Sequence, residues 1–231
     1  MFIDADQIRH NTKGELEEPL PDFKRLKADG GYNDYNHTEF EDPGEPGTVF
    51  DNEAYEARLE LWHHSLVGWS GAVSLLYRNQ DFAAIGEEAF VAPTETQSSG
   101  AFIVEERQFG PVTVELGGGY ERRDAGASSG NPDVDHDLYS LSADVIYKFA
   151  KNYALNVSAT GSQRAPAAQE LYTDGPHLAT LTFEQGDSSL HGETAYSVDI
   201  GLRRTEGRLT WSLNAFANWI DDFIYQQGVD S

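Results

Sequence analysis

Apolar and polar residues alternate with a period of two along most of the chain. In the stretch 112–121, Val112, Val114 and Leu116 fall on one side, whereas Thr113 and Glu115 fall on the other. The same alternation recurs at 139–149, 153–162, 196–203 and 210–219, and helical periodicity is almost absent. Because successive side chains of a strand point to opposite faces, the pattern predicts an all-β chain of about ten strands, each of roughly 9 to 15 residues.

The connections between these strands alternate in length. Short turns are expected at 64–69, 109–111, 150–152 and 205–208, and long polar loops around 38–48, 82–98, 124–137 and 164–192. The strands exceed the usual five or six residues of soluble proteins. Long antiparallel strands, with short turns at one end and long loops at the other, are typical of a transmembrane β-barrel with periplasmic turns and extracellular loops.

Aromatic residues gather near the expected strand ends, as the two interfacial girdles of a membrane barrel require. They are Trp62, Trp69, Tyr77, Phe109, Tyr147, Phe149, Tyr153, Trp211, Trp219, Phe223 and Tyr225. In a soluble β-sandwich the same aromatics would form the core. The barrel is favoured by the strand length, by the asymmetry of the loops and by a polar side rich in Ser, Thr, Asn, Glu and Arg. The alternative is a soluble or surface β-sandwich that acts as a binding or adhesion module.

Charge and composition narrow the possible partners. The 231 residues carry 39 acids against 16 bases, a net charge of −23, which excludes nucleic-acid binding because phosphate contacts need a basic face. Metal ions, other cationic partners or a merely solvated acidic surface remain possible. The absence of cysteine excludes disulfides and thiolate metal sites. The chain contains no G-x-S-x-G, P-loop or H-E-x-x-H motif, so we do not expect an enzyme.

Two stretches combine imidazole and carboxylate groups, which suit zinc. In the first, His37, Glu39 and Glu41 would share one face of a strand and could converge from a lumenal wall. The alternative is the solvated acidic surface that the charge of the chain also allows. His63 and His64 point to opposite faces beside a short turn, so we expect them at an interface and not in a metal site.

The second stretch holds four candidate ligands, Asp133, Asp135, His136 and Asp137. The three aspartates reproduce the first half of an EF-hand loop, but Leu138 stands where that loop needs glycine, and Asp144 falls inside an expected strand. Loose capture of a divalent ion and a solvated acidic loop are therefore the remaining interpretations.

The stretch from Arg164 to Thr194 resembles a loop-and-strand signature of TonB-dependent outer-membrane receptors. The matching positions are Arg164, Pro166, Glu170, Leu171, Tyr172, Gly175, Pro176, His177, Ala179, Thr180, Phe183, Glu184, Gly186, Leu190, Glu193 and Thr194. Residues 32–41 and 80–107 resemble the zinc-uptake branch of the same family. This signature argues against a passive porin-like pore.

The resemblance implies a receptor barrel of about 22 strands in the bacterial outer membrane. It also implies an N-terminal plug, driven by the TonB–ExbB–ExbD complex through the proton-motive force. The chain lacks a signal peptide, a TonB box, a plug-like sequence and an aromatic-terminated last strand. We therefore expect residues 1–231 to be an internal segment of the barrel, an open sheet with two unpaired edges that folds poorly without the other strands.

The receptor is expected to need no cofactor and to take zinc, another metal or a metal chelate as cargo. Within the signature, Arg164 is expected to pair with Glu170 or Glu184 and so to hold the loop against the barrel wall. His177 is expected to be either a ligand or an anchor of the loop.

Overall fold

The computed structural model describes residues 2–42, 45–86, 89, 91–128, 130–177 and 182–228, and the side chains of 41, 42, 45, 46 and 177 lie outside this description. Of the predicted residues, Ala179 and Thr180 fall outside the described ranges, as do the side chains of Glu41 and His177.

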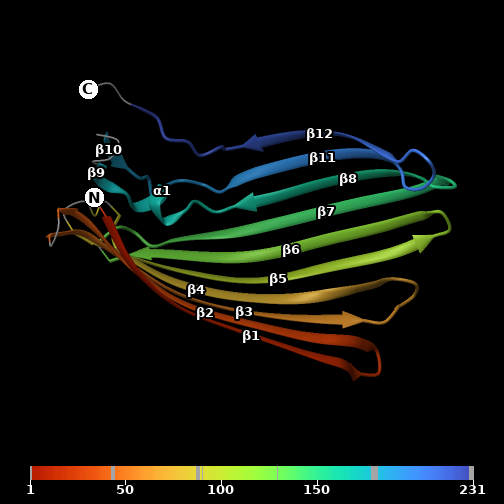
Figure 1. Cartoon of the computed structure of the whole chain (residues 1–231), viewed down its shortest axis with the longest axis horizontal. Coiled ribbons are helices and arrows are strands. Elements are labelled where there is room, and N and C mark those ends of the chain that lie inside the picture. The colour runs from red at the N-terminus through yellow and green to blue at the C-terminus, as the bar shows by residue number, and fades with distance from the viewer. Residues whose placement is uncertain are drawn as a thin grey trace.

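The described residues form one antiparallel sheet of ten strands in which each strand pairs with its neighbour along the chain, in the order β1 to β8, β11, β12 (Figure 1). The strands are β1 (Phe2–Leu20), β2 (Phe23–Asp42), β3 (Glu45–His63), β4 (Ser70–Gly86), β5 (Thr94–Phe109), β6 (Val112–Ala127), β7 (Val134–Ala150), β8 (Tyr153–Arg164), β11 (Glu193–Arg204) and β12 (Trp211–Asp221). The predicted all-β fold and antiparallel order are confirmed. One extended sheet, and not two packed sheets, also shows that the β-sandwich alternative is wrong.

Between β8 and β11 the chain leaves the sheet. There it forms the short helix α1 (Ala168–Tyr172) and a small hairpin of β9 (Asp174–His177) and β10 (Thr182–Gln185). At five residues, α1 is too short to produce a periodic sequence pattern, and it was not predicted. No helix in the described ranges is long and apolar enough to cross a membrane.

The turns at one end of the sheet are short, as Figure 1 shows on its right side. They comprise residues 21–22, 64–69, 110–111, 151–152 and 205–210. Gly110 and Asn152 have φ of +59° and +68°, a left-handed conformation that glycine and asparagine accept at tight turns. The predicted short turns are therefore confirmed.

Three of the four predicted long loops, around 38–48, 82–98 and 124–137, are shorter than expected because the strands continue into them, whereas the connection 165–192 is as long as predicted. Strand β2 extends to Asp42 and β3 begins at Glu45, and β6 ends at Ala127 while β7 begins at Val134. Strands of 16 to 20 residues result, against the 9 to 15 predicted. In the sequence these strand ends look like loops because both of their faces are polar. The backbone hydrogen bonds to the antiparallel partner form regardless of side-chain polarity, so the strands continue.

The sheet has one apolar and one polar face. Register places on the apolar face Leu26, Leu59, Leu61, Val73, Leu75, Ile103, Leu116, Leu141, Val145, Val157, Val198, Ile200, Leu202 and Leu213. Many of these side chains are exposed, for example Leu141 at 72% and Leu75 at 53%. An exposed aliphatic band is what lipid contact requires, and the opposite polar face suits a water-filled lumen.

Two rows of aromatic side chains border this aliphatic band. The row nearer the long loops, here called the tyrosine row, contains Tyr32, Tyr55, Tyr77, Tyr120, Tyr139, Tyr196 and Trp219. At the short-turn end, Trp69 packs on Phe109, and Tyr147, Phe149, Tyr153 and Trp211 follow one another with ring centroids 5.9–6.3 Å apart. The predicted girdles are present, with one correction. Trp62 lies on the polar face, where Lys27 sits 5.7 Å from its ring centroid.

Candidate functional site

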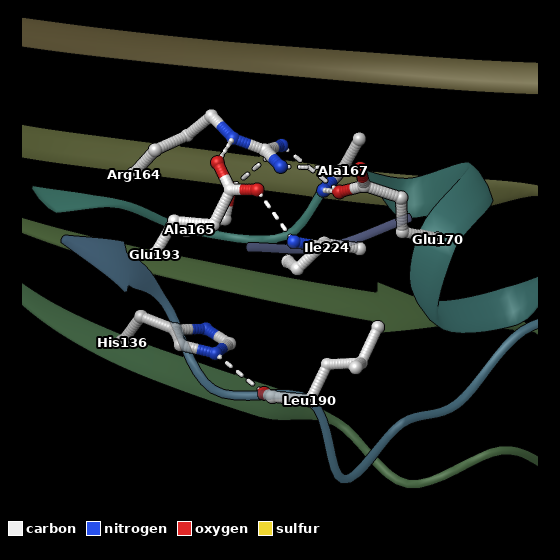
Figure 2. A network of polar contacts seen from close by, with 8 residues as sticks. All are labelled: His136, Arg164, Ala165, Ala167, Glu170, Leu190, Glu193 and Ile224. Atoms are coloured by element: carbon white, nitrogen blue, oxygen red, sulfur yellow. Dashed lines mark hydrogen bonds and ion pairs between the residues drawn. The ribbon is translucent and has the colours of Figure 1, made fainter. Parts of the chain in front are cut away.

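The loop between β8 and β11 is fixed by a charged network around Arg164 (Figure 2). Its guanidinium donates to Glu193 at 2.7 Å and to both carboxylate oxygens of Glu170 at 2.9 and 3.2 Å. Glu170 also accepts from the backbone N–H of Ala167 at 2.6 Å, which caps the start of α1. The predicted Arg164–Glu170 pair is confirmed. The second partner of Arg164 is Glu193, which lies directly opposite it in the β8–β11 register.

Glu193 joins three segments of the chain. Beyond its contact with Arg164, its other oxygen accepts from the backbone N–H of Ile224 at 2.6 Å, so the segment after β12 is held to the same carboxylate (Figure 2). Glu193 is only 9% exposed. The hydrogen bond from Arg164, followed by that from Ile224, holds the pKa of the Glu193 carboxyl below its usual value. Hydrogen bonds to a carboxylate favour its charged form, so the network is strongest with Glu193 ionised.

A small apolar core seats α1 against β6 and β7. Leu171 and Tyr172 are 3% and 2% exposed and pack with Ala125, with Val134 and Leu190 at the margin. The Tyr172 hydroxyl lies 2.8 Å from the carbonyl oxygen of Ala125 and 3.1 Å from that of Pro132, so its single proton is shared between these two acceptors. A buried tyrosine can pack its ring in an apolar core while its hydroxyl makes a directional hydrogen bond. Tyr172 therefore fixes α1 to the end of β6.

Replacing Tyr172 by phenylalanine is expected to loosen α1 by about 1–2 kcal/mol, because it leaves the buried carbonyl of Ala125 without its side-chain donor. Hydrogen exchange of the α1 amides in the full-length receptor measures the change. Tyr139→Phe is the matched control, since Tyr139 is 59% exposed on the apolar face. Equal protection in the two variants would contradict the role given to the Tyr172 hydroxyl.

The remaining signature residues lie on either side of α1. Pro166 is fully buried, and Gly175 and Pro176 pair with Glu184 and Phe183 in the β9–β10 hairpin. The N–H of Gly186 donates to the carbonyl of Thr173 at 2.7 Å. Thr173 also bridges to Val91 of the β4–β5 connection, which ties two loops together at this end. His177 pairs with Thr182 through the backbone, and its predicted role stays a prediction.

The first candidate metal stretch lies in β2. His37 Nε2 is 3.8 Å from a Glu39 oxygen, on the polar face as predicted, and the imidazole stacks on Phe50 with ring centroids 4.4 Å apart. Nδ1 of His37 is buried and has no hydrogen-bond partner among the described residues. The β2–β3 register shifts between Glu39 and Phe40 and again before Asp42, and the side chain of Glu41 lies outside the described residues.

The second candidate stretch is divided between the two faces of β7. Asp135 and Asp137 point to the side of Arg122, whose guanidinium lies 3.1 and 3.7 Å from them. His136 points to the polar face, where its Nε2 is 3.2 Å from the carbonyl of Leu190 (Figure 2). This Asp-His-Asp run is a strand and not a loop, so its side chains diverge. Within the described ranges no group of three or more His, Asp or Glu residues is arranged to hold a metal ion. Zinc contact by either stretch stays a prediction.

A row of carboxylates follows the tyrosine row toward the long-loop end. Asp34, Glu53, Asp81 and Glu95 lie directly opposite one another across β2, β3, β4 and β5, on the same face as Tyr32 and Tyr55. They line a hollow of about 980 Å³, together with Asp51, Asp124, Asp133 and Asp135. Among the described residues of its wall, none is basic. Like charges facing one another are unfavourable, and desolvation together with Glu95 and Glu53 raises the pKa of Asp81.

This carboxylate row was not predicted from the sequence. Its four members are far apart along the chain and become neighbours only when the register is known. The row lies outside the polar lumen, on the face that carries the lipid-facing aliphatic band. The negative charge of the chain therefore does not collect only on the polar face.

Comparison with known proteins matches this geometry. The model of the family "TonB dependent receptor-like, beta-barrel" matches residues 3–231. Among solved structures, the copper transporter OprC superposes with a TM-score of 0.76 at 14% identity, covering 95% of this chain and 39% of that protein. The FrpB iron transporter from Neisseria meningitidis gives 0.75 at 14% identity, covering 94% of this chain and 37% of that protein.

A third solved structure is the Serratia marcescens hemophore receptor HasR, in complex with its hemophore HasA and heme. It gives a TM-score of 0.73 at 14% identity and covers 95% of this chain and 40% of that protein. At these identities the structural likeness shows the fold, and the chain spans about two-fifths of the length of each of these relatives. The match over almost all residues shows that the chain belongs to the β-barrel domain family of the TonB-dependent receptors, whose members are β-barrels of the bacterial outer membrane.

Proposed function

We propose that this chain forms part of the wall of an outer-membrane receptor that takes up a scarce metal, with zinc the first candidate, or a metal chelate. Cargo would enter at the long-loop end, bind between barrel and plug, and pass when TonB, energised by ExbB and ExbD, remodels the plug. The receptor acts as a transporter and not as an enzyme, and it needs no bound cofactor of its own.

One observation carries this proposal: a ten-stranded sheet with one apolar and one polar face also holds the β8–β11 loop in place. The aliphatic band between two aromatic rows fits lipid, and the polar face fits an aqueous path. The Arg164–Glu170–Glu193 network holds the β8–β11 loop against the polar face at the mouth of that path. The solved relatives named above include transporters of copper and of iron, which supports a metal or its complex as cargo.

Zinc is tested by calorimetry on the full-length receptor with zinc chloride, with His37→Ala and His136→Ala beside the wild type. If either histidine is a ligand, its loss is expected to weaken zinc binding by about tenfold or more, since the ligand set becomes incomplete. His64→Ala is the matched control, because His64 is exposed beside the short turn that ends β3.

Each outcome of this experiment is informative. Weaker zinc binding in His37→Ala or His136→Ala, with His64→Ala unchanged, supports zinc as cargo and places a ligand on the barrel wall. Zinc binding that is unaffected by both substitutions contradicts these two residues as ligands. No zinc binding by the wild type contradicts zinc itself, and the search then turns to chelates.

A further inference from the structure

The carboxylate row on the outer face of β2 to β5 lies at the level of the lipid headgroups. Asp34 and Glu53 come two residues beyond Tyr32 and Tyr55 of the tyrosine row, on the same face. At about 3.3 Å per residue they lie about 7 Å further along the strand, or about 5 Å along the membrane normal for a strand tilted by about 40°. The headgroup region on each side of the hydrocarbon core is about 5–8 Å thick. The row therefore faces the polar layer of the membrane.

No basic group neutralises this row in the part of the chain that the structure describes. None of its four carboxylates lies within 4.0 Å of a basic nitrogen, whereas those near Arg122 do. Their described partners are neutral donors: the Tyr32 hydroxyl donates to Glu53 at 3.0 Å and the Asn79 NH₂ group donates to Glu95 at 2.9 Å. Carboxylates that face one another across neighbouring strands repel, so the row is more stable when a cation joins it.

An amide oxygen beside the row has no partner. Asn79 precedes Asp81 by two residues on β4, so the two side chains lie on the same face, and Asn79 is only 4% exposed. Its NH₂ group is held by Glu95, while its Oδ1 is buried and has no hydrogen-bond partner among the described residues. Exchanging the two ends of the amide would set the oxygen against the Glu95 carboxylate. An unpaired buried acceptor is costly, so Asn79 also requires an electropositive ligand.

The available donors suit a hard cation. Mg²⁺ and Ca²⁺ bind carboxylate and amide-carbonyl oxygens, whereas zinc prefers imidazole and thiolate, and no histidine lies among the described residues of the hollow. Within the described ranges no three Asp, Glu or His side chains converge on one point. Two neighbouring carboxylates and one amide oxygen therefore leave part of the coordination shell to ligands from outside the chain. Mg²⁺ is commonly bound in this way, through one or two carboxylates together with phosphate oxygens and waters.

We propose that Asp81, Glu95 and the amide oxygen of Asn79 bind Mg²⁺ or Ca²⁺ on the outer wall of the barrel, and that phosphate groups of the surrounding lipid complete the coordination of the ion. Asp81 and Glu95 are directly opposite across β4 and β5, where Cβ atoms are about 5 Å apart, so one ion can contact both carboxylates. Lipid phosphates and the carboxylate row are both negative and repel one another, and a shared divalent cation turns this repulsion into attachment. The site lies on the face opposite the cargo path and is separate from the proposed uptake function.

Cation binding is tested by calorimetry with magnesium chloride and calcium chloride on the full-length receptor, in a detergent without phosphate. Asp81→Asn combined with Glu95→Gln removes both charges and keeps the size of the side chains, and Asn79→Leu removes the amide oxygen. Glu121→Gln combined with Asp199→Asn is the control pair. It removes the same charge from the polar face, where the register places no carboxylate opposite either residue.

We expect the wild type and the control pair to bind the ions alike, and the double variant at Asp81 and Glu95 to bind them about tenfold or more weakly. Asn79→Leu should weaken binding as well. Without divalent ions the double variant should melt no lower than the wild type, because it removes a repulsion, and added calcium should raise the melting temperature of the wild type alone. No binding by the wild type, undiminished binding by the double variant, or a double variant that melts earlier without ions would overturn the proposal.

The lipid is tested by native mass spectrometry of the same receptor with dioleoylphosphatidic acid, which has a free phosphate, and with dioleoylphosphatidylcholine, whose phosphate carries choline. Magnesium chloride should increase the phosphatidic acid bound to the wild type, but not that bound to the double variant, and should leave phosphatidylcholine unchanged. Phosphatidic acid binding that does not depend on magnesium would overturn the shared coordination. Sodium phosphate that strengthens magnesium binding as much as phosphatidic acid does would assign the open ligands to soluble phosphate and overturn the lipid as partner.

Discussion

Replacing Arg164 by glutamine is expected to release α1 and the segment after β12 together, at a cost of about 1.5–3 kcal/mol in the free energy of local opening. The substitution removes the charged donor of Glu170 and Glu193 and leaves Glu193, 9% exposed, with only the N–H of Ile224 among the described contacts. The side chain of Arg164 is 45% exposed, so solvent keeps the cost below the 3–5 kcal/mol, roughly, of a fully buried pair.

Hydrogen exchange of the full-length receptor measures this effect at amides that depend on the network. Leu171, Thr173 and Ile224 should lose protection together, because they donate to Ala167, Gln169 and Glu193. Arg203→Gln is the control, an exposed arginine on β11. If Arg164→Gln leaves the protection at Ile224 intact, Glu193 is not the link between the two segments.

Acidification should imitate this substitution. The pKa of Glu193 is depressed by Arg164, so its ionised form stabilises the folded loop at pH values above about 4.5, the ordinary value. That contribution is lost as the pH falls through the lower folded-state value, because protonation removes the charged acceptor. Protection corrected for intrinsic exchange should therefore be constant between about pH 5 and 7 and fall below about pH 4, and Glu193→Gln should abolish this dependence.

Replacing Gly186 by alanine is expected to push the chain after β10 away from α1, destabilising the loop by about 1–3 kcal/mol. A Cβ on this residue would lie 2.7 Å from the carbonyl carbon of Leu171, 2.8 Å from the nitrogen of Tyr172 and 2.9 Å from the oxygen of Glu170. All three atoms belong to the backbone of the helix, so no side chain can rotate to make room.

The readout is exchange at the two amides that close this contact, Gly186 to the carbonyl of Thr173 and Asp187 to that of Glu170. Gly14→Ala serves as the control, since its added carbon meets only the carbonyl of Ala28 at 3.9 Å. Unchanged exchange at Asp187 in Gly186→Ala would mean that the helix and the turn do not touch as described.

The membrane-facing part of the wall is predictable from the sequence for a simple physical reason. Lipid on one face and water on the other impose a period of two, which is why the alternation alone assigns Leu141, Val145 and Val157 to the apolar face. Beyond the tyrosine row both faces meet water, so the period disappears. Residues 124–127 and 134–137 therefore resemble a loop in sequence, although they belong to β6 and β7.

The candidate site is harder to predict from the sequence than the membrane-facing strands. Arg164 and Glu170 are close along the chain, so their pairing is predictable, but Glu193 joins them only through the β8–β11 register. A hollow on the polar face of the first four strands has the same origin, since its basic residues Arg9, Arg58 and Arg78 come from three strands. His136 was grouped with its neighbouring aspartates because that stretch was expected to be a loop, whereas a strand sends alternate side chains apart.

The carboxylate row also makes the outer surface sensitive to the composition of the surrounding medium. At about 0.15 M ionic strength a charge is felt over about 8 Å, so Asp34, Glu53, Asp81 and Glu95 act only on molecules that touch them. At about 0.01 M the range grows to about 30 Å, comparable to the thickness of the hydrocarbon layer. In dilute fresh water the same row would attract cations and repel anions over this longer range, whereas in brine the salt would screen its charges almost completely.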